Sequence, residues 1–99
     1  MSTPLVSVLI PCYNAEKYIG ETLESVFRQT WQNIEVIVVD DGSKDNSADV
    51  VRRFRRPNLK LIEQTNHGQT ASLNECLAHA NGDLVQYLDA DDLIAPDKI

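Results

Sequence analysis

Apolar residues fall into two kinds of pattern along this chain, and the two alternate. Short runs of consecutive apolar residues are typical of strands buried on both faces of a sheet. Four such runs span residues 5–10, 34–39, 59–63 and 84–88, of which the third is the weakest. Between them, apolar residues recur at helical spacing over about residues 15–29, 45–55 and 69–80. The pattern therefore predicts alternating strands and helices, with a further helix starting near Pro96.

This alternation predicts the fold class. Strand–helix–strand units close with right-handed crossovers, which gives a mainly parallel sheet. We expect one three-layer α/β/α domain across residues 1–99, with strand order 3-2-1-4. In such sheets, ligands bind outside the carboxyl ends of the strands, where the strand order reverses. That crevice would lie between the first and fourth strands.

The predicted helices carry expectations about their ends and faces. Asn14 is expected to cap the first helix, and Ser43 or Asp45 the second. The third helix is expected to turn one side, formed by Leu73, Leu77 and Ala80, toward the sheet.

Composition and charge exclude several classes of protein. The chain is 42% apolar and 24% charged, which is ordinary for a soluble globular domain. Its net charge of −6 argues against a general nucleic-acid binder. No apolar run approaches the roughly 20 residues of a transmembrane helix, and the N-terminus lacks a signal-peptide pattern. We therefore expect a cytoplasmic protein in which Cys12 and Cys76 are reduced thiols.

Candidate chemistry follows the fourth apolar run. Asp89, Asp91 and Asp92 place three carboxylates within four residues, which is unfavourable unless a cation lies among them. Carboxylate oxygens at a strand end suit Mg²⁺ or Mn²⁺, and such an ion would also bind a diphosphate. Tyr13 offers an aromatic surface for a base, and Asp41 can accept a hydrogen bond from a base or a ribose hydroxyl. Together these residues predict a site for a nucleoside diphosphate.

Simpler interpretations of the same residues stay open, and two other phosphate-binding motifs are absent. No GxGxxG follows the first strand, and the sequence contains no GxxxxGKS/T. Residues 89–92 could be a solvated acidic turn that caps a helix near Pro96. Residues 40–43 could form only a turn, in which Asp40 is structural, and Tyr13 could simply cover the sheet edge.

Several motifs together resemble family 2 glycosyltransferases. They are Val6–Asn14, Val38–Asp45 with its Asp-Asp-Gly-Ser, Asn66-x-Gly68, Asn74 with Ala80-x-Gly82-Asp83, and Leu88–Asp92, which is similar to the family's Asp-x-Asp motif. They cover nearly the whole chain in the family's order. The resemblance implies a GT-A fold, of which this chain would form the Rossmann-like half that binds a nucleotide sugar.

The resemblance also implies roles for individual residues. The nucleotide-binding residues would be Pro11, Tyr13, Asn14, Asp41 and Asp89, and the metal ligands would be Asp91 and Asp89. Tyr13 would stack on the base and Asp41 would bond it, the base usually being uracil. Asp89 would lie near the ribose and the metal, whereas Asp91 would ligate Mg²⁺ or Mn²⁺ directly. Leu73 departs from the family, because many members have a basic residue there.

The implied reaction moves a sugar from a nucleotide-diphosphate donor, expected to be a UDP-sugar, to a hydroxyl of a saccharide or lipid-linked acceptor. A metal ion would neutralise the leaving diphosphate while a base takes the acceptor's proton, with inversion at the sugar. No convincing base occurs among these residues. We expect it beyond residue 99, in a protein of which this chain is a truncated piece, and we expect the 99 residues alone to be inactive.

Three other functions fit parts of the sequence. A non-catalytic nucleotide-sugar-binding module would use the same site without turnover. A phosphoacceptor receiver domain would carry an acidic pair after the first strand, where Pro11–Asn14 stands here. A haloacid-dehalogenase-type phosphatase would also place its Asp-x-Asp after the first strand rather than the fourth.

Two surface features predict association. In a chain ending at residue 99, the strand at 84–88 would have an unpaired outer edge, which predicts a homodimer or disorder near residues 89–99. Arg52, Arg53, Arg55 and Arg56 cluster at the end of a predicted helix. They could be a solvated face favoured by the helix dipole, or a contact with anionic lipid at the inner face of a membrane.

Overall fold

A computed structural model of the chain describes residues 4–91. Its elements are β1 (Val6–Cys12), α1 (Ile19–Phe27), β2 (Ile34–Asp41), α2 (Ser47–Arg52), β3 (Leu59–Gln64), α3 (Gln69–His79) and β4 (Leu84–Tyr87). All strand pairs are parallel, and the order β3-β2-β1-β4 confirms the predicted topology. The helix predicted near Pro96 lies outside the described residues.

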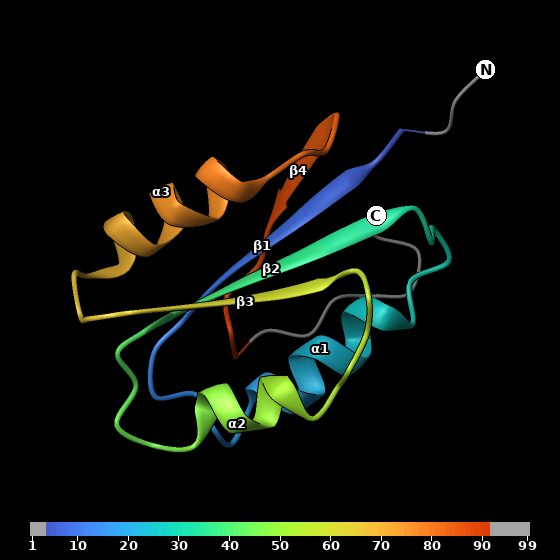
Figure 1. The fold of residues 1–99 in the computed structure, drawn as a ribbon. Coiled ribbons are helices and arrows are strands. Elements are labelled where there is room, and N and C mark those ends of the chain that lie inside the picture. Colours follow the sequence, from blue (N-terminus) through green and yellow to red (C-terminus); the bar gives the residue numbers. More distant parts are fainter. Residues whose placement is uncertain (1–3, 92–99) are drawn as a thin grey trace.

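The sheet lies between two helical layers (Figure 1). Helices α1 and α2 cover one face and α3 covers the other. Every residue of β1 and β2 is buried, as their continuous apolar runs predict for central parallel strands. The two core clusters lie on opposite faces of these strands, the larger under α1 and α2 and the smaller under α3. No helix in the described part of the chain is long and apolar enough to cross a bilayer.

Strand β1 continues through Pro11 to Cys12, two residues beyond the end of the apolar run 5–10 that predicts this strand. Leu9 accepts a hydrogen bond from the N–H of Leu88, so alternate residues of β1 direct their backbone groups toward β4. Pro11 shares this orientation, but the pairing with β4 ends at Leu9 and Tyr87. The missing proline N–H therefore costs no ladder hydrogen bond.

The prediction that Asn14 caps the first helix is wrong. Helix α1 begins at Ile19 with Tyr18 at its N-cap, and Asn14 lies in a turn with φ of +49°. Its side-chain oxygen accepts a hydrogen bond from the backbone N–H of Lys44 at 2.8 Å. Asparagine tolerates this left-handed conformation, so Asn14 joins two loops instead of starting a helix.

The prediction that Ser43 or Asp45 caps the second helix is wrong, because Asn46 occupies the N-cap of α2 and makes no side-chain cap hydrogen bond. Asp45 lies one residue earlier. Its carboxylate accepts a hydrogen bond from the N–H of Ser47 at 3.0 Å, whereas Ser43 donates to Asp40. The helix ends at Arg52, earlier than the predicted end near Arg55.

The face that helix α3 packs against the sheet differs from the face that its leucine spacing predicts. Its buried residues are Ser72 and Cys76, and the Cys76 thiol donates to the carbonyl oxygen of Ile37 at 3.7 Å. Leu73 and Ala80 are only partly buried, and Leu77 is 47% exposed. Small side chains at positions 72 and 76 allow the helix to approach the strands closely, which puts Leu77 outside. Both cysteines are free thiols, as predicted.

Candidate active site

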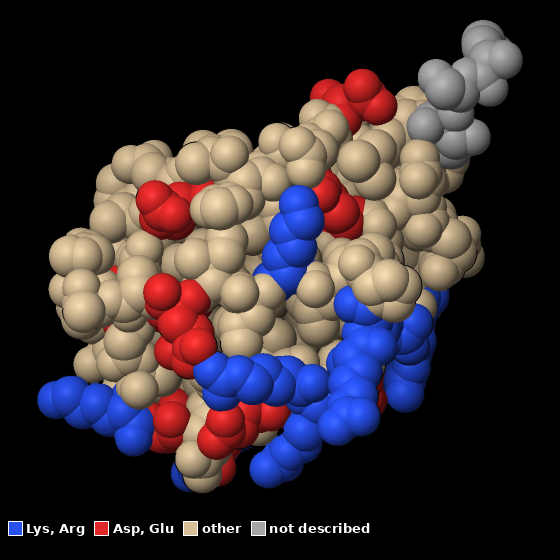
Figure 2. All heavy atoms as spheres, in the orientation of Figure 1, with Lys and Arg blue, Asp and Glu red and all other residues tan. Residues whose placement is uncertain are grey.

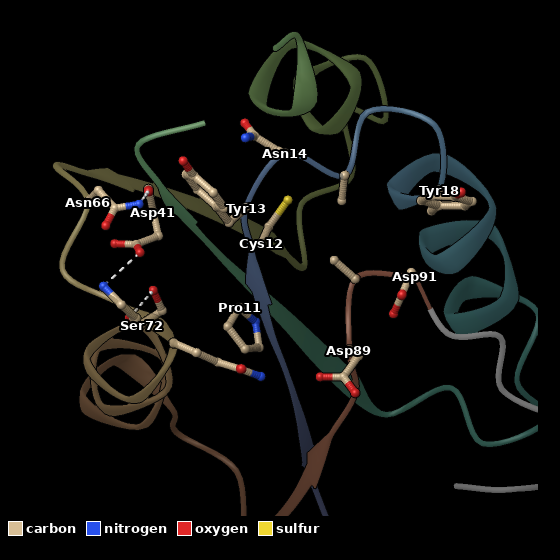
Figure 3. Close-up of a pocket in the computed structure, with 14 residues that line it drawn as sticks. Pro11, Cys12, Tyr13, Asn14, Tyr18, Asp41, Asn66, Ser72, Asp89 and Asp91 are labelled. Atoms are coloured by element: carbon tan, nitrogen blue, oxygen red, sulfur yellow. Dashed lines mark hydrogen bonds between the residues drawn. The ribbon is translucent and has the colours of Figure 1, made fainter. Parts of the chain in front are cut away.

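A cavity of about 530 Å³ opens at the carboxyl ends of the strands. Its lining comes from the ends of β1 and β2, from the segments that follow β1, β3 and β4, and from the first turn of α3. Tyr13, Asp41, Asp89 and Asp91 all line it, as the strand order predicts (Figure 3). The structure thus brings the predicted site residues to one place.

Pro11 and Tyr13 lie between the two acidic sides of the cavity (Figure 3). The Pro11 ring lies between Asp41 and Asp89, and the Tyr13 ring stands beside Asp41. Tyr13 is 46% exposed. Its ring is accessible to a planar ligand in the cavity.

Asp41, at the end of β2, is buried and holds the loop that follows β3. Its Oδ1 accepts hydrogen bonds from the Gln64 side chain at 2.9 Å and from the His67 N–H at 2.8 Å. Its Oδ2 accepts the Gly68 N–H at 2.9 Å. A carboxylate has about four acceptor positions, so one position on Oδ2 is left for a ligand. Asp41 therefore has two roles: it holds the loop after β3, which lines the cavity, and it lines the cavity itself.

The hydrogen bonds to Asp41 predict acid sensitivity. Burial disfavours its charged form, but the bonds from Gln64, His67 and Gly68 outweigh burial and lower its pKa below the ordinary 3.8. The unfolded chain then binds this proton at a higher pH than the folded chain, so stability is lost as the pH falls below about 4. We expect urea midpoints to drop from pH 5 to pH 3. Asp41→Asn should remove only the share of this dependence that Asp41 contributes, because the pKa values of Glu35 and Asp45 are lowered as well, and the exposed-site variant Asp49→Asn is the control.

Asp89 is held by a short chain of hydrogen bonds. The Tyr87 hydroxyl donates to Asp89 Oδ1 at 2.6 Å, and Gln69 Nε2 donates to the Tyr87 hydroxyl at 2.7 Å. This chain links the end of β4 to the start of α3. It fixes the Asp89 side chain on the cavity side opposite Asp41 (Figure 3).

Asp91 lies beside Asp89 in the same cavity and is exposed (Figure 3). Among residues 4–91, no group of three or more His, Cys, Asp or Glu side chains could hold a metal ion. Two neighbouring carboxylates nevertheless fit Mg²⁺ or Mn²⁺, because such ions are usually held by one or two carboxylates with water and substrate phosphates. Asp92 lies outside the described residues.

Asn14 lines the cavity, but its backbone N–H and its side-chain oxygen form hydrogen bonds to other residues of the protein. Besides its side-chain bond to Lys44, its N–H donates to the Ser43 hydroxyl at 2.9 Å. The Glu16 N–H makes a parallel bond to Asp45 at 3.1 Å. These bonds join the loops after β1 and β2, so Asn14 positions Tyr13 beside Asp41.

The Cys12 thiol faces the cavity but is no nucleophile at neutral pH. Burial, with a smaller effect of the nearby Asp40 charge, raises its pKa to about 12. Since the thiolate is the reactive form, Cys12 acts as a small apolar residue.

Sequence reasoning missed four cavity residues. They are Ala15, Tyr18, Gln69 and Ser72, which lie in none of the motifs named in the sequence analysis. Tyr18 is 52% exposed although it directly precedes the buried residues of α1. A large aromatic residue near the start of a predicted helix is a feature of the sequence that could have marked it as a candidate cavity residue. Gln69 and Ser72 lie one helical turn apart at the start of α3, and no pattern in the sequence distinguishes them from other polar helix residues.

Known proteins are similar to this chain in sequence and in fold. The chain is 41% identical over 102 residues to an uncharacterized glycosyltransferase of Haemophilus influenzae, covering 100% of this chain and 41% of that protein. The structure of S. aureus TarS 1–349 in complex with UDP-GlcNAc matches with a TM-score of 0.87 at 40% identity, covering 92% of this chain and 28% of TarS. The mannosyltransferase PcManGT of Pyrobaculum calidifontis, in complex with GDP-Man and Mn²⁺, matches with a TM-score of 0.85 at 37% identity, covering 94% and 29%.

The chain thus spans between 28% and 41% of the length of these relatives. Its fold, with sheet order β3-β2-β1-β4, matches the two solved glycosyltransferase structures, which have the GT-A fold. Residues 7–99 match the family described as "Glycosyl transferase family 2". With this match and the cavity at the strand ends, the chain belongs to glycosyl transferase family 2.

Proposed function

We propose that the chain is the donor-binding part of a metal-assisted, inverting glycosyltransferase that uses a UDP-sugar. The observation that carries this proposal is the single cavity in which an accessible tyrosine ring, a buried aspartate with a spare acceptor position and an Asp-x-Asp pair lie together. The complexes of TarS with UDP-GlcNAc and of PcManGT with GDP-Man and Mn²⁺ support a nucleotide sugar as the ligand.

Each group of residues would contact a different part of the donor. Tyr13 would stack on the base and Asp41 would accept its N–H. Asp89 would lie near the ribose and would share a divalent ion with Asp91. That ion, when bound, would neutralise the charge that grows on the leaving diphosphate. The acceptor's hydroxyl would attack from the opposite side of the sugar.

The hydrogen bonds of Asp41 favour uracil over guanine. Three of its acceptor positions are already used by Gln64, His67 and Gly68. Uracil presents a single ring N–H, which matches the one remaining position on Oδ2. Guanine presents an N–H and an amino group side by side, so one of its donors would stay unpaired at a cost.

Metal-dependent nucleotide binding tests the proposal. We expect calorimetric titration of the chain with UDP to show binding that strengthens when Mn²⁺ is added, and weaker binding of GDP. Asp91→Asn should remove the Mn²⁺ effect and weaken UDP binding by roughly tenfold, or about 1.4 kcal/mol. Binding without sugar transfer is expected from these 99 residues alone.

Asp49→Asn is the matched control, because Asp49 is an exposed α2 residue paired with Arg52 and lies outside the cavity. It should bind UDP as the unsubstituted chain does. UDP binding that is unaffected by both Mn²⁺ and Asp91→Asn would remove the metal from the proposal. Equal affinity for UDP and GDP would contradict the role given to Asp41.

A further inference from the structure

Four arginines, Arg52, Arg53, Arg55 and Arg56, lie within five residues at the end of α2; we name them the arginine surface. They are four of the nine Lys and Arg residues in a chain of net charge −6. Figure 2 shows the basic side chains gathered on this side of the molecule. Charges are screened over about 10 Å at moderate salt, so an anion near this surface meets a local positive field despite the acidic chain.

The helix dipole explains only half of this cluster. Its stabilising effect on cations is limited to the last turn. Arg52 ends α2 and Arg53 is its C-cap, whereas Arg55 and Arg56 follow the helix. Arg52 is also neutralised, because it pairs with Asp49 at 2.7 Å and with Glu63. Among the described residues, no ion pair neutralises Arg53, Arg55 or Arg56.

The backbone conformation of Arg55 also supports a role for its side chain. Its φ is +46°, a left-handed conformation in which chains usually place glycine or asparagine after a helix. A long cationic side chain at this position is less stable than glycine. Local strain of this kind is often kept where the side chain is used.

A small hollow lies beside these arginines. Its volume is about 110 Å³, and it is lined by the cationic residues Arg52, Arg55 and Arg56 and by the apolar residues Val51, Leu59 and Leu61. The Arg56 guanidinium lies 4.2 Å from the centre of the Phe27 ring. The hollow therefore has both cationic and apolar lining residues. This combination fits an amphiphile better than free phosphate.

We propose that the arginine surface docks this protein on a bilayer containing anionic phospholipid. Headgroup phosphates would bind Arg53, Arg55 and Arg56, and the hollow would receive apolar atoms next to the headgroup. Arg52 stays paired with Asp49 and Glu63 and orients the end of α2.

Docking there leaves the nucleotide cavity open. The cavity lies at the carboxyl ends of the strands, whereas the end of α2 and the start of β3 lie at the opposite edge of the parallel sheet. Lipid binding and UDP binding should therefore be independent. The inference extends the proposed function without depending on it, because loss of one activity leaves the other measurable.

Vesicle co-sedimentation tests this inference. The chain should bind vesicles of phosphatidylcholine mixed with phosphatidylglycerol, less so as salt rises, and should not bind phosphatidylcholine alone. Each basic residue at an anionic surface contributes about fivefold to partitioning, so Arg53→Gln with Arg55→Gln should weaken binding about 25-fold. Arg55→Gly should weaken it about fivefold while keeping or raising the melting temperature, which separates lost binding from lost folding.

The matched control replaces two exposed lysines away from the hollow, Lys17→Gln with Lys44→Gln. It removes the same charge and should retain most of the binding. An equal loss in this control would overturn the inference, since net charge would then be responsible. So would equal sedimentation with neutral and anionic vesicles, or arginine-dependent binding of inorganic phosphate or RNA without vesicle binding.

Discussion

Asp41→Ala is expected to cost about 3 kcal/mol of unfolding free energy and to abolish measurable UDP binding. The substitution leaves the Gln64 amide and the N–H groups of His67 and Gly68 without their acceptor. Hydrogen bonds to a charged partner contribute about 1.5–3 kcal/mol each, and water would replace part of this at the exposed loop. Urea denaturation followed by circular dichroism measures the first effect and calorimetry the second.

Two further variants test the structural role of Asp41 through their effects on the free energy of unfolding. Gln64→Met keeps the side-chain size and removes one donor to Asp41, so a loss of about 1 kcal/mol is expected. Asp49→Ala, at an exposed position, should stay within about 0.5 kcal/mol of the unsubstituted chain. If Asp41→Ala is no less stable than Asp49→Ala, Asp41 does not hold the loop after β3.

Gly82→Ala should destabilise the fold by about 3 kcal/mol, at the upper end for an added core methyl group. A Cβ on Gly82 would lie 2.5 Å from Ser7 Oγ, 2.7 Å from the Ser7 nitrogen and 2.8 Å from the Leu5 carbonyl oxygen. Two of these atoms are backbone atoms, one in the central strand β1 and the other in Leu5 directly before it, and neither can move cheaply. Ser7 also accepts the Gly82 N–H and donates to the buried Glu35, so any shift breaks this network at the start of β4.

Gly20→Ala is the control for the same chemical change. Gly20 lies inside α1, and an added Cβ would meet only Val50 Cγ1 at 3.5 Å, an ordinary contact. Alanine is preferred over glycine in a helix, so this variant should gain about 0.5–1 kcal/mol. Ser7→Ala should rescue Gly82→Ala only in part, because the two backbone clashes remain. Equal stability of the two glycine variants would show that residue 82 does not approach β1 closely.

The fold followed from local patterns in the sequence. Runs such as 34–39 have no polar face, and a strand without one must be covered on both sides. Alternation with helices then leaves parallel pairing and right-handed crossovers as the economical solution. For the same reason, the polar residues that end each run, among them Tyr13, Asp41 and Asp89, were predicted to meet at one edge.

The helix ends and faces were predicted less well. Asn14 has the composition of an N-cap, but its side chain bonds Lys44, thirty residues along the chain. In α3, leucine spacing favoured Leu77 as an inward residue, whereas Ser72 and Cys76 are the buried ones. Close packing on Ile37 decided the rotation of that helix, and periodicity within one helix carries no information about its partner.

The sequence by itself determined the order of the elements, their parallel pairing and the edge at which the candidate site forms, since these depend on residues that are neighbours in the chain. Only the tertiary structure decided how many acceptor positions Asp41 has left, that Tyr87 and Gln69 hold Asp89, and that a hollow lies between the arginines and β3. These properties depend on contacts such as those of Asp41 with Gln64 and of Tyr87 with Gln69, which join residues far apart in the chain and whose distances no local pattern specifies.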